Sequence, residues 1–406
     1  MNSKTIGGIL LVSGTTVGAG MLALPVVTGF AGFIPAVLLM LAYWLFMTYT
    51  AFLILEINLW MEKKDANMVT MAQATLGKIG ACFAWIVYLF LLYALTTAYL
   101  AGGGPIVSQL LFDATGIQVP RALESVPLLV VFGYFVYRGA HTVDWINRVL
   151  MIGLVASYGV AVYLLAPHIE GKLLSHADFS LIWMGSSVAA TSFGFHIIIP
   201  TLTTYLNKDL HQLRRVIWIG SAIPLVVYLV WEALVLGILP LGGGSGLAEG
   251  YRMGSNGAAL LSAYLGQGVL PEVLRLFLLL AIVTSFLGVS TSLTDFLADG
   301  FSVKKTVWGR VFLLLLTFGP PLGFVLTDPR AFLSALEYAG AFGVVVLLGL
   351  LPAIMAWRGR KGIGKGAKYA VKGGSFGLAA AVFCSLLAIT IEILQKLGVL
   401  WIKSGY

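Results

Sequence analysis

Long apolar stretches alternate with short polar intervals along the whole chain. Each apolar stretch has about 17 to 30 residues, and a transmembrane α-helix needs about 20. The polar intervals are too short for a separate soluble domain, so we predict one transmembrane domain over residues 1–406. The first stretch is long and leads into no cleavage site, so we expect a span and not a signal peptide. The eleven predicted spans cover residues 6–30, 34–60, 79–112, 121–137, 143–166, 181–204, 215–239, 271–302, 308–326, 331–356 and 375–397.

Composition supports this pattern. Hydrophobic residues make up 59% of the chain and charged residues only 10%, and the mean hydropathy is +0.96. The fold class is therefore predicted as an all-α polytopic membrane protein. The two cysteines, Cys82 and Cys384, lie in or beside spans, so neither a disulfide framework nor a metal site is expected.

The net charge of +8 raises the question of a nucleic-acid partner, but the placement of the basic residues gives a better explanation. Lys and Arg gather in alternate loops, as the positive-inside bias requires, if the N-terminus is cytoplasmic and the C-terminus external. We therefore expect a lipid bilayer as partner and no nucleic acid. The most basic stretch, 358–372, is interpreted as a cytoplasmic loop near anionic lipid, with a specific lipid site left open. The loop between spans seven and eight is Gly-rich and predicted to carry short helices.

The first predicted span is interrupted near its middle. The run Ser13–Pro25 holds Gly14, Gly18 and Gly20 together with two threonines. Each Gly costs a helix about 1 kcal/mol relative to Ala, and broken helix is tolerated in hydrocarbon only where it lines a cavity or site. Helix packing is the alternative, because Gly14 and Gly18 have the small-xxx-small spacing of membrane helix interfaces.

Span six carries a similar interruption between Ala189 and Thr201, with Gly194 followed by Pro200. Each interrupted span opens a group of five, and an odd group size makes the second group enter the membrane from the opposite side. This pattern indicates inverted repeats, over about 6–166 and 181–356, with an extra helix at 375–397. The broken helices would meet half-way across the bilayer, where helix N-termini favour a carboxylate and freed carbonyls favour an ammonium or a cation.

Four runs carry a family likeness: Gly14–Pro25, Thr191–His196, Gly220–Leu225 and Thr284–Gly288. They resemble the hydroxy and aromatic amino acid permease family, within the amino acid–polyamine–organocation superfamily, and most of all the bacterial tyrosine-specific permeases. The resemblance covers nearly the whole chain. It implies a LeuT-type fold, with a five-plus-five inverted repeat, discontinuous helices 1 and 6 and an eleventh transmembrane helix. It also implies cation-coupled amino acid uptake across a bacterial inner membrane.

The resemblance further implies which residues surround the substrate. The superfamily holds the substrate backbone at its two broken helices, where glycine lets the chain approach the ligand closely. In span three, Tyr93 and Thr96 lie on one helix face and are candidates for lining the site, whereas Tyr88 and Tyr99 are interpreted as packing residues. The substrate-binding candidates are Thr15, Thr16, Gly18, Ala19, Gly20, Tyr93, Thr96, Phe193, Gly194, Phe195 and His196.

Span eight bears on the coupling ion. By family position, the candidate sodium ligands are Gly14, Val17, Ala281, Thr284 and Ser285. Carbonyl and hydroxyl oxygens suit a hard cation such as Na⁺. Proton-coupled relatives commonly place a span-five lysine there, and residues 149–160 contain none. The residues therefore favour Na⁺ over H⁺, although hydroxyls that only cap local carbonyls are an alternative. No cofactor is expected.

Ionisable side chains inside predicted spans are functional candidates, because burying them in hydrocarbon is costly. His196 could hydrogen-bond a phenol, carry a proton or satisfy an unwound carbonyl. Glu232 could carry a proton or pair structurally. Glu56, Asp295 and Asp299 lie at the cytoplasmic ends of spans two and eight and are expected in gating ion pairs.

The predicted function is a symporter that imports an aromatic amino acid, with L-tyrosine favoured, by alternating access. Tryptophan, phenylalanine or a small hydroxy amino acid is the alternative substrate, and we expect a monomer or a weak oligomer. A channel would show rings or filter repeats in place of paired helix breaks. An enzyme is not expected, because the chain has no His-Glu-x-x-His, Gly-x-Ser-x-Gly or phosphate-loop motif.

Overall fold

The computed structural model describes residues 3–61, 66–304 and 306–400, and within these ranges the regular structure is helical, without strands. Nine helices in these ranges are long and apolar enough to cross a membrane, and a bent pair makes ten. The bent pair is α1 (Ser3–Thr16) and α2 (Gly20–Thr28), which meet at 53°. Seven of the nine are single helices: α3 (Phe33–Trp60), α4 (Met68–Thr115, kinked at Gly77), α6 (Ala140–Leu165), α10 (Leu210–Ile238), α13 (Val269–Gly300), α14 (Val307–Thr327) and α17 (Gly374–Lys396).

Two further spans are composite. Span six consists of η3 (Phe179–Gly185), α8 (Ser186–Ser192), η4 (His196–Ile198) and α9 (Ile199–Tyr205). Span ten consists of α15 (Ala331–Tyr338), the π-helical stretch η5 (Ala339–Leu350) and α16 (Leu351–Gly359). The π-helical stretch was not predicted. Such stretches are rare and gather at functional sites, and η5 packs against α8.

The predicted fourth span is shorter than expected. Residues 121–137 form η1 (Arg121–Leu123) and then α5 (Ser125–Arg138), which has 14 residues and so a length of about 21 Å against a hydrocarbon thickness of about 30 Å. Pro127 stands in the first turn of α5, where its missing N–H costs nothing, and it disfavours a longer helix upstream. The third span begins earlier than predicted, because α4 includes a leading segment that is kinked at Gly77, with φ of +79°.

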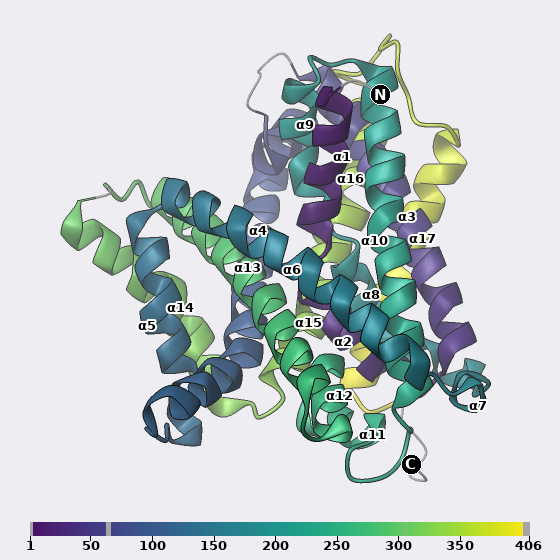
Figure 1. Cartoon of the computed structure of the whole chain (residues 1–406). Coiled ribbons are helices and arrows are strands. Elements are labelled where there is room, and N and C mark those ends of the chain that lie inside the picture. The colour runs from purple at the N-terminus through teal and green to yellow at the C-terminus, as the bar shows by residue number, and fades with distance from the viewer. Residues whose placement is uncertain (1–2, 62–65, 305, 401–406) are drawn as a thin grey trace.

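The loops carry short helices. The predicted Gly-rich loop contains α11 (Leu247–Met253) and α12 (Gly257–Leu265), which confirms the expectation of short helices there. Another loop, between α6 and span six, contains η2 (Ala166–His168) and α7 (Gly171–Leu174). Both loops lie at the end of the molecule away from the start of α1 (Figure 1).

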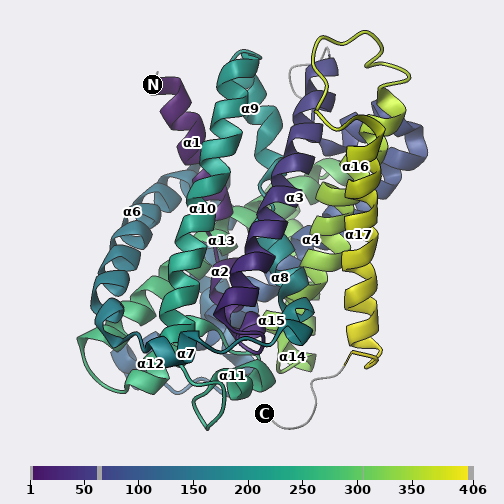
Figure 2. The same cartoon turned by 90° about the vertical axis from the view of Figure 1, so that its right-hand side faces the viewer.

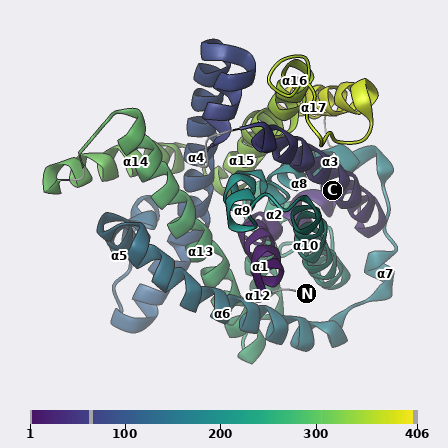
Figure 3. The same cartoon turned by 90° about the horizontal axis from the view of Figure 1, so that it is seen from above.

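The two interrupted spans run antiparallel to each other. Helix α1 contacts α9, and α2 contacts α8, so the first half of one span lies beside the second half of the other. Around them stand α3 and α10 on one side, while α5 and α14 lie at the far edge (Figure 3). Helices α4 and α13 pack against each other between these two groups. The core that surrounds the breaks therefore combines residues from both halves of the chain.

The outer faces of the bundle are apolar. The side chains of Ile152 on α6 and Phe383 on α17 are 74% and 65% exposed. Many such residues exposed together would be a liability in water, but they fit a surface that faces lipid tails. Helix α1 begins and α17 ends at opposite ends of the bundle (Figure 2). The structure and the composition thus agree on a multi-pass membrane protein.

Helix α17 is tied to the rest of the bundle by polar contacts. The Ser187 hydroxyl of α8 donates to Glu392 Oε2 at 2.5 Å, and Lys396 Nζ lies 2.6 Å from Glu337 Oε2 of α15. The Glu392 and Glu337 side chains are buried. A buried carboxylate needs a charge partner or hydrogen bonds, and Lys396 serves both carboxylates.

Candidate substrate site

The first break leaves a short stretch of backbone outside any helix. Residues 17–19 separate α1 from α2. The hydroxyls of Thr15 and Thr16 donate back to carbonyls of their own helix, while the Ala19 N–H donates to Ser285 Oγ of α13 at 3.3 Å. The break is therefore partly satisfied by a helix from the second half of the chain.

The second break is tighter and is closed by turns. The Phe193 and Gly194 N–H groups donate to the carbonyls of Ala190 and Thr191. Pro200 stands at the start of α9, where a helix tolerates its missing N–H. The side chains of Phe193, Phe195 and His196 are buried, so this break is packed and the chain restarts as helix almost at once.

One hydroxyl joins the two breaks. Tyr228, on α10, donates to the Thr16 carbonyl oxygen at 2.6 Å and to the Ser192 carbonyl oxygen at 3.0 Å. These carbonyls belong to the last residues of α1 and α8, where a helix end lacks its usual partners. The Tyr228 ring also lies 5.3 Å from the Phe193 ring, centroid to centroid. Tyr228 thus positions both breaks with a single side chain.

Two glycines allow close approach at the first break. A Cβ on Gly20 would lie 2.9 Å from Ser192 Oγ, and a Cβ on Gly18 would lie 2.8 Å from Ser285 Oγ. Both distances are shorter than ordinary contacts of a Cβ. The absence of a side chain at these positions lets Gly20 of α2 approach α8 and lets Gly18 in the break approach α13.

A cavity of about 380 Å³ lies where the breaks meet. Its walls come from α1, the first break, α4, α6, the second break, α13 and η5. Most of the lining area is apolar, and hydroxyl groups and exposed backbone supply the polar part. The lining residues are Gly14, Thr15, Thr16, Val17, Gly18, Gly20, Tyr88, Leu91, Leu92, Leu95, Tyr99, Asn147, Met151, Thr191, Ser192, Gly194, Phe195, Ile197, Ile198, Thr284, Ser285, Gly288, Val289, Ser292 and Val344.

Most of the predicted substrate residues line this cavity, and some do not. Thr15, Thr16, Gly18, Gly20, Gly194 and Phe195 do, whereas Ala19, Tyr93, Thr96, Phe193 and His196 lie behind its walls. The Tyr93 hydroxyl donates instead to the Leu316 carbonyl of α14 at 2.8 Å. The Thr96 hydroxyl donates to the Leu92 carbonyl of its own helix.

His196 lies in the core beside α3. Its Nε2 is 2.8 Å from the Thr50 Oγ1, and its Nδ1 has no hydrogen-bond partner among the described residues. The imidazole thus does not reach the cavity. Of the three roles open to His196 from sequence, a hydrogen bond to a phenolic substrate has no contact to support it here.

The predicted sodium ligands also lie close together. Gly14, Val17, Thr284 and Ser285 line the cavity, and Ala281 lies one turn before Ser285 on α13. In this structure the Thr284 and Ser285 hydroxyls donate to the carbonyls of Leu280 and Ala281, at 2.8 Å and 2.9 Å. The donor set is oxygen-only, as a hard cation requires.

The other ionisable candidates lie away from the cavity. Glu232 is buried between α10 and α2, where its Oε1 accepts from the Thr28 hydroxyl and its Oε2 has no partner among the described residues. Glu56 is buried at the end of α3 and is paired with Arg360. Asp295 is half-buried on the last turns of α13, and Asp299 is exposed there.

Sequence reasoning missed several lining residues. Tyr88, Leu95 and Tyr99 share one face of α4 with Leu92, at spacings of three or four. Tyr88 and Tyr99, interpreted from the sequence as packing residues, therefore also line the cavity. The phase of α4 turns this face to the breaks and turns Tyr93 toward α14. Asn147 was also missed; its Oδ1 has no partner among the described residues. A polar side chain on an otherwise apolar helix face was the available signal.

Comparison with known proteins agrees with this geometry. The sequence profile of the tryptophan/tyrosine permease family matches residues 1–392. The chain belongs to this family. Its members are transport proteins and not enzymes, and a broken-helix cavity inside a multi-pass bundle fits that role.

Relatives that match almost the whole chain of this permease are named for the amino acid that they transport. It is 36% identical to tyrosine-specific transport system 1 of Haemophilus influenzae, with 98% of each chain covered. It is 33% identical to tyrosine-specific transport system 2 of the same organism, with 100% of each chain covered. A tryptophan-specific transport protein of that organism is 31% identical, over 98% of this chain and 97% of the relative.

Proposed function

We propose that this permease is a cation-coupled symporter that imports L-tyrosine by alternating access. The observation that carries the proposal is the cavity at the meeting point of two antiparallel broken helices. Family membership and the tyrosine-specific relatives support the substrate class. An aromatic amino acid needs a mostly apolar pocket with a few polar anchors, and these lining residues supply both.

The breaks offer complementary partners for a zwitterion. Helix α2 begins at Gly20, so its positive dipole end favours the substrate carboxylate near Gly18 and Gly20. Helix α8 ends at Ser192, so its negative end favours the ammonium. The aromatic side chain then fits among Tyr88, Tyr99 and Phe195. Glycine at the first break allows the backbone to contact the ligand directly.

We infer that the ten spans before α17 form a LeuT-type inverted repeat. Contacts between helices support this, because they come in matched pairs. Span one packs on span seven (α1 on α10) as span six packs on span two (α9 and α8 on α3). Span five packs on span eight (α6 on α13) as span ten packs on span three (α15 and η5 on α4). Each pair is related by a shift of five spans.

We propose Na⁺ as the coupling ion, with H⁺ as the alternative. The clustered oxygens of Gly14, Val17, Ala281, Thr284 and Ser285 support Na⁺, and so does the lack of lysine in residues 149–160. If H⁺ is used, Glu232 is the carrier that we favour, because it is buried and one of its oxygens lacks a partner. Glu56, Asp295 and Asp299 remain proposed gating residues.

We place the protein in a bacterial inner membrane with the N-terminus cytoplasmic and the C-terminus external, acting as a monomer or weak oligomer. A second cavity of about 530 Å³ shares Tyr88 and Ile197 with the first and continues past Pro200 to Asn67 at the start of α4. This path leads to the end of the bundle where α1 begins. The conformation is therefore proposed to face the cytoplasm.

Uptake of radiolabelled tyrosine into proteoliposomes tests the proposal, with Na⁺ and pH gradients imposed separately. We expect concentrative uptake that needs a Na⁺ gradient and collapses when an ionophore dissipates it. Uptake that ignores Na⁺ and follows the pH gradient would reject the sodium site. Uptake that never exceeds equilibration would reject symport in favour of a channel. Competition with unlabelled tryptophan, phenylalanine and serine identifies the preferred substrate, tryptophan being the rival that the relatives suggest.

A further inference from the structure

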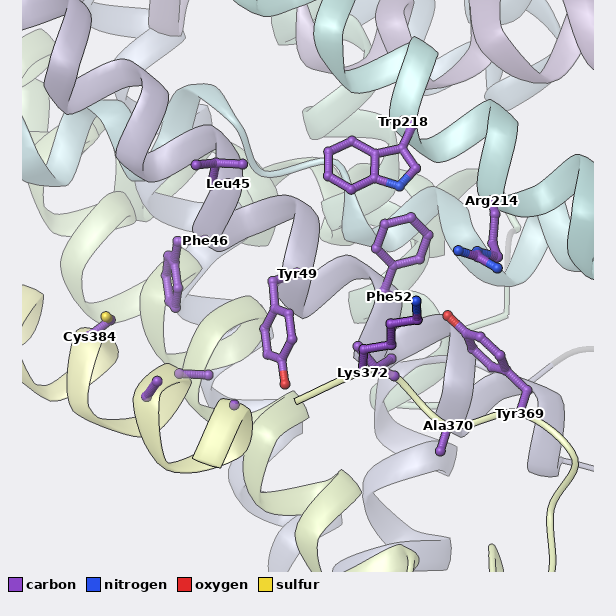
Figure 4. Close-up of a pocket in the computed structure, with 14 residues that line it drawn as sticks. Leu45, Phe46, Tyr49, Phe52, Arg214, Trp218, Tyr369, Ala370, Lys372 and Cys384 are labelled. Atoms are coloured by element: carbon purple, nitrogen blue, oxygen red, sulfur yellow. The ribbon is translucent and has the colours of Figure 1, made fainter. Parts of the chain in front are cut away.

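A third cavity, separate from the two described above, lies on the outside of the bundle. It has a volume of about 690 Å³ and is enclosed by α3, the first turns of α10, the segment 369–372 and α17. Figure 4 shows its side chains. None of its lining residues belongs to the substrate cavity, so transport as proposed above does not explain it.

The cavity is polar at one end and apolar at the other. The Arg214 guanidinium, the Tyr369 hydroxyl and the Lys372 amine gather at one end, while Phe46 and Cys384 lie at the other (Figure 4). Lys372 just precedes α17, which begins at Gly374. Cys384 lies about 15 Å further along the same helix at 1.5 Å per residue. The cavity thus extends from the helix ends into the depth of the membrane.

The buried carboxylate of Glu56 fixes the backbone next to Lys372. Glu56 accepts from Arg360 Nε and Nη2 at 2.7 Å and 2.8 Å, and from the Val371 N–H at 2.7 Å. Arg360 also donates to the Val371 carbonyl. This network fixes the backbone beside Lys372 and uses the charge of Arg360 on Glu56. Hydrogen bonds therefore hold the segment at the basic end of the cavity in place.

The remaining cations are available to a ligand. Neither Arg214 nor Lys372 forms an ion pair with a described residue. Burial raises the pKa of Tyr369 to about 12, so its hydroxyl stays protonated and can donate. Two cations and a phenol match the oxygens of a phosphate. The other walls are mostly apolar, with Phe52 and Trp218 next to the charged groups and Leu45 farther from them (Figure 4).

We propose that this cavity binds one anionic phospholipid. Its phosphate lies between Arg214, Tyr369 and Lys372, and one of its two acyl chains runs along α3 and α17 toward Cys384. The charge of the rim selects an anionic headgroup. The apolar depth excludes free phosphate as the sole occupant, because the greater part of the cavity would gain nothing from it. The site connects α3 and α10, which flank the breaks, with α17.

Native mass spectrometry of the full chain, released from micelles with added phosphatidylglycerol or phosphatidylcholine, tests the site. The double variant Arg214→Gln with Lys372→Gln should weaken phosphatidylglycerol binding about tenfold to thirtyfold. This range follows because each Lys or Arg near an anionic lipid surface contributes a similar part of the binding free energy. The control is Arg215→Gln with Lys368→Gln, which removes the same charge from exposed positions outside the lining. The control should bind phosphatidylglycerol as the unmodified chain does.

A second variant keeps every charge and blocks the apolar part. Ala380→Trp places an indole in the lower cavity and should also reduce phosphatidylglycerol retention. Thermal unfolding of each variant verifies folding. Equal loss in the control pair, equal binding of phosphatidylcholine, or full retention in Ala380→Trp would each overturn the proposal. The measurement needs no transport, so its failure and the failure of the proposed symport can be told apart.

Discussion

Between Thr16 and Gly20 two helices meet at 53°, whereas between Ser192 and Ile199 the chain turns beside the buried rings of Phe193 and Phe195. Both breaks contribute glycine to the cavity wall. The first break borrows a partner from α13, through Ser285. The second break satisfies its N–H groups locally, through turns that reach back to Ala190 and Thr191. Two interruptions with similar sequence signals are thus built differently.

The difference indicates a division of roles. Val17 and Gly18 are half-buried and line the cavity. At the second break Gly194 and Phe195 also line it, while the buried Phe193 and His196 anchor that break in the core. Tyr228 links the two breaks by serving one carbonyl from each. A rigid second break gives the exposed first break a fixed surface to close upon. Each prediction below separates the exposed break from the packed one.

The largest effect is expected at Gly18. Gly18→Leu would drive a side chain into Ser285, since even a Cβ would lie 2.8 Å from its Oγ, and it would fill the cavity. We expect tyrosine uptake to be abolished in a protein that still folds. Gly159→Leu is the control, because a Cβ there meets nothing within 4 Å and the position lies outside the cavity. Normal uptake by the Gly18 variant would refute the substrate placement.

The next effect concerns the link between the breaks. Tyr228→Phe keeps the ring against Phe193 but removes the hydroxyl from two buried carbonyls, which should cost about 1–3 kcal/mol of stability. Uptake should fall about tenfold as the breaks lose their register. Tyr158→Phe removes a comparable bond, to the Val227 carbonyl at 2.9 Å, away from the breaks. If both variants lose stability and uptake alike, Tyr228 is only a packing residue.

An intermediate effect is expected from Ser285→Ala, which removes the α13 hydroxyl that accepts from the Ala19 N–H of the first break. The Na⁺ concentration for half-maximal uptake should rise about tenfold, if a ligand worth about 1.4 kcal/mol is lost. The control is Ser290→Ala on the same helix, where the buried hydroxyl has no partner among the described residues. An unchanged Na⁺ response in Ser285→Ala would mean that this hydroxyl serves only the Ala281 carbonyl and the Ala19 N–H.

The smallest effect is expected at the packed break. Thr50→Val removes the contact of Thr50 with His196 Nε2 and should lower stability by about 1 kcal/mol, measured by thermal unfolding, with uptake within about twofold of the original. A large loss of uptake with little loss of stability would show that His196 takes part in transport. The division of roles would then need revision.

The outline of the fold could be read from the sequence because membrane helices carry their signal locally. Runs such as 34–60 are long and apolar, and α3 follows that run within one residue. Glycine inside such runs, as at Gly18 and Gly194, marks the breaks for the same reason. The length of α5 and the π-helical form of span ten depend on neighbours and proline placement, which hydropathy does not report.

The interior of the site could be read only in part. Positions such as Gly18 and Gly20 could be predicted because glycine inside an apolar span marks a break, and the family resemblance implies that substrate binds at such breaks. The choice between Tyr93 and Tyr99 depends on the rotation of α4, and an apolar helix with few polar marks gives little information on it. Tyr228 was not singled out from the sequence, because the carbonyls to which it donates are exposed by two breaks far from it in the chain.

The tie between α17 and the rest of the bundle has a practical consequence. Glu392 of this helix accepts a hydrogen bond from Ser187 of α8, and Lys396 forms an ion pair with Glu337 of α15. Variants that shorten this helix, or carry a bulky reporter close to Lys396, would lose contacts that hold α8, which contributes Thr191 and Ser192 to the candidate cavity. A reporter is better fused at the N-terminal end, because no ion pair among the described residues involves α1.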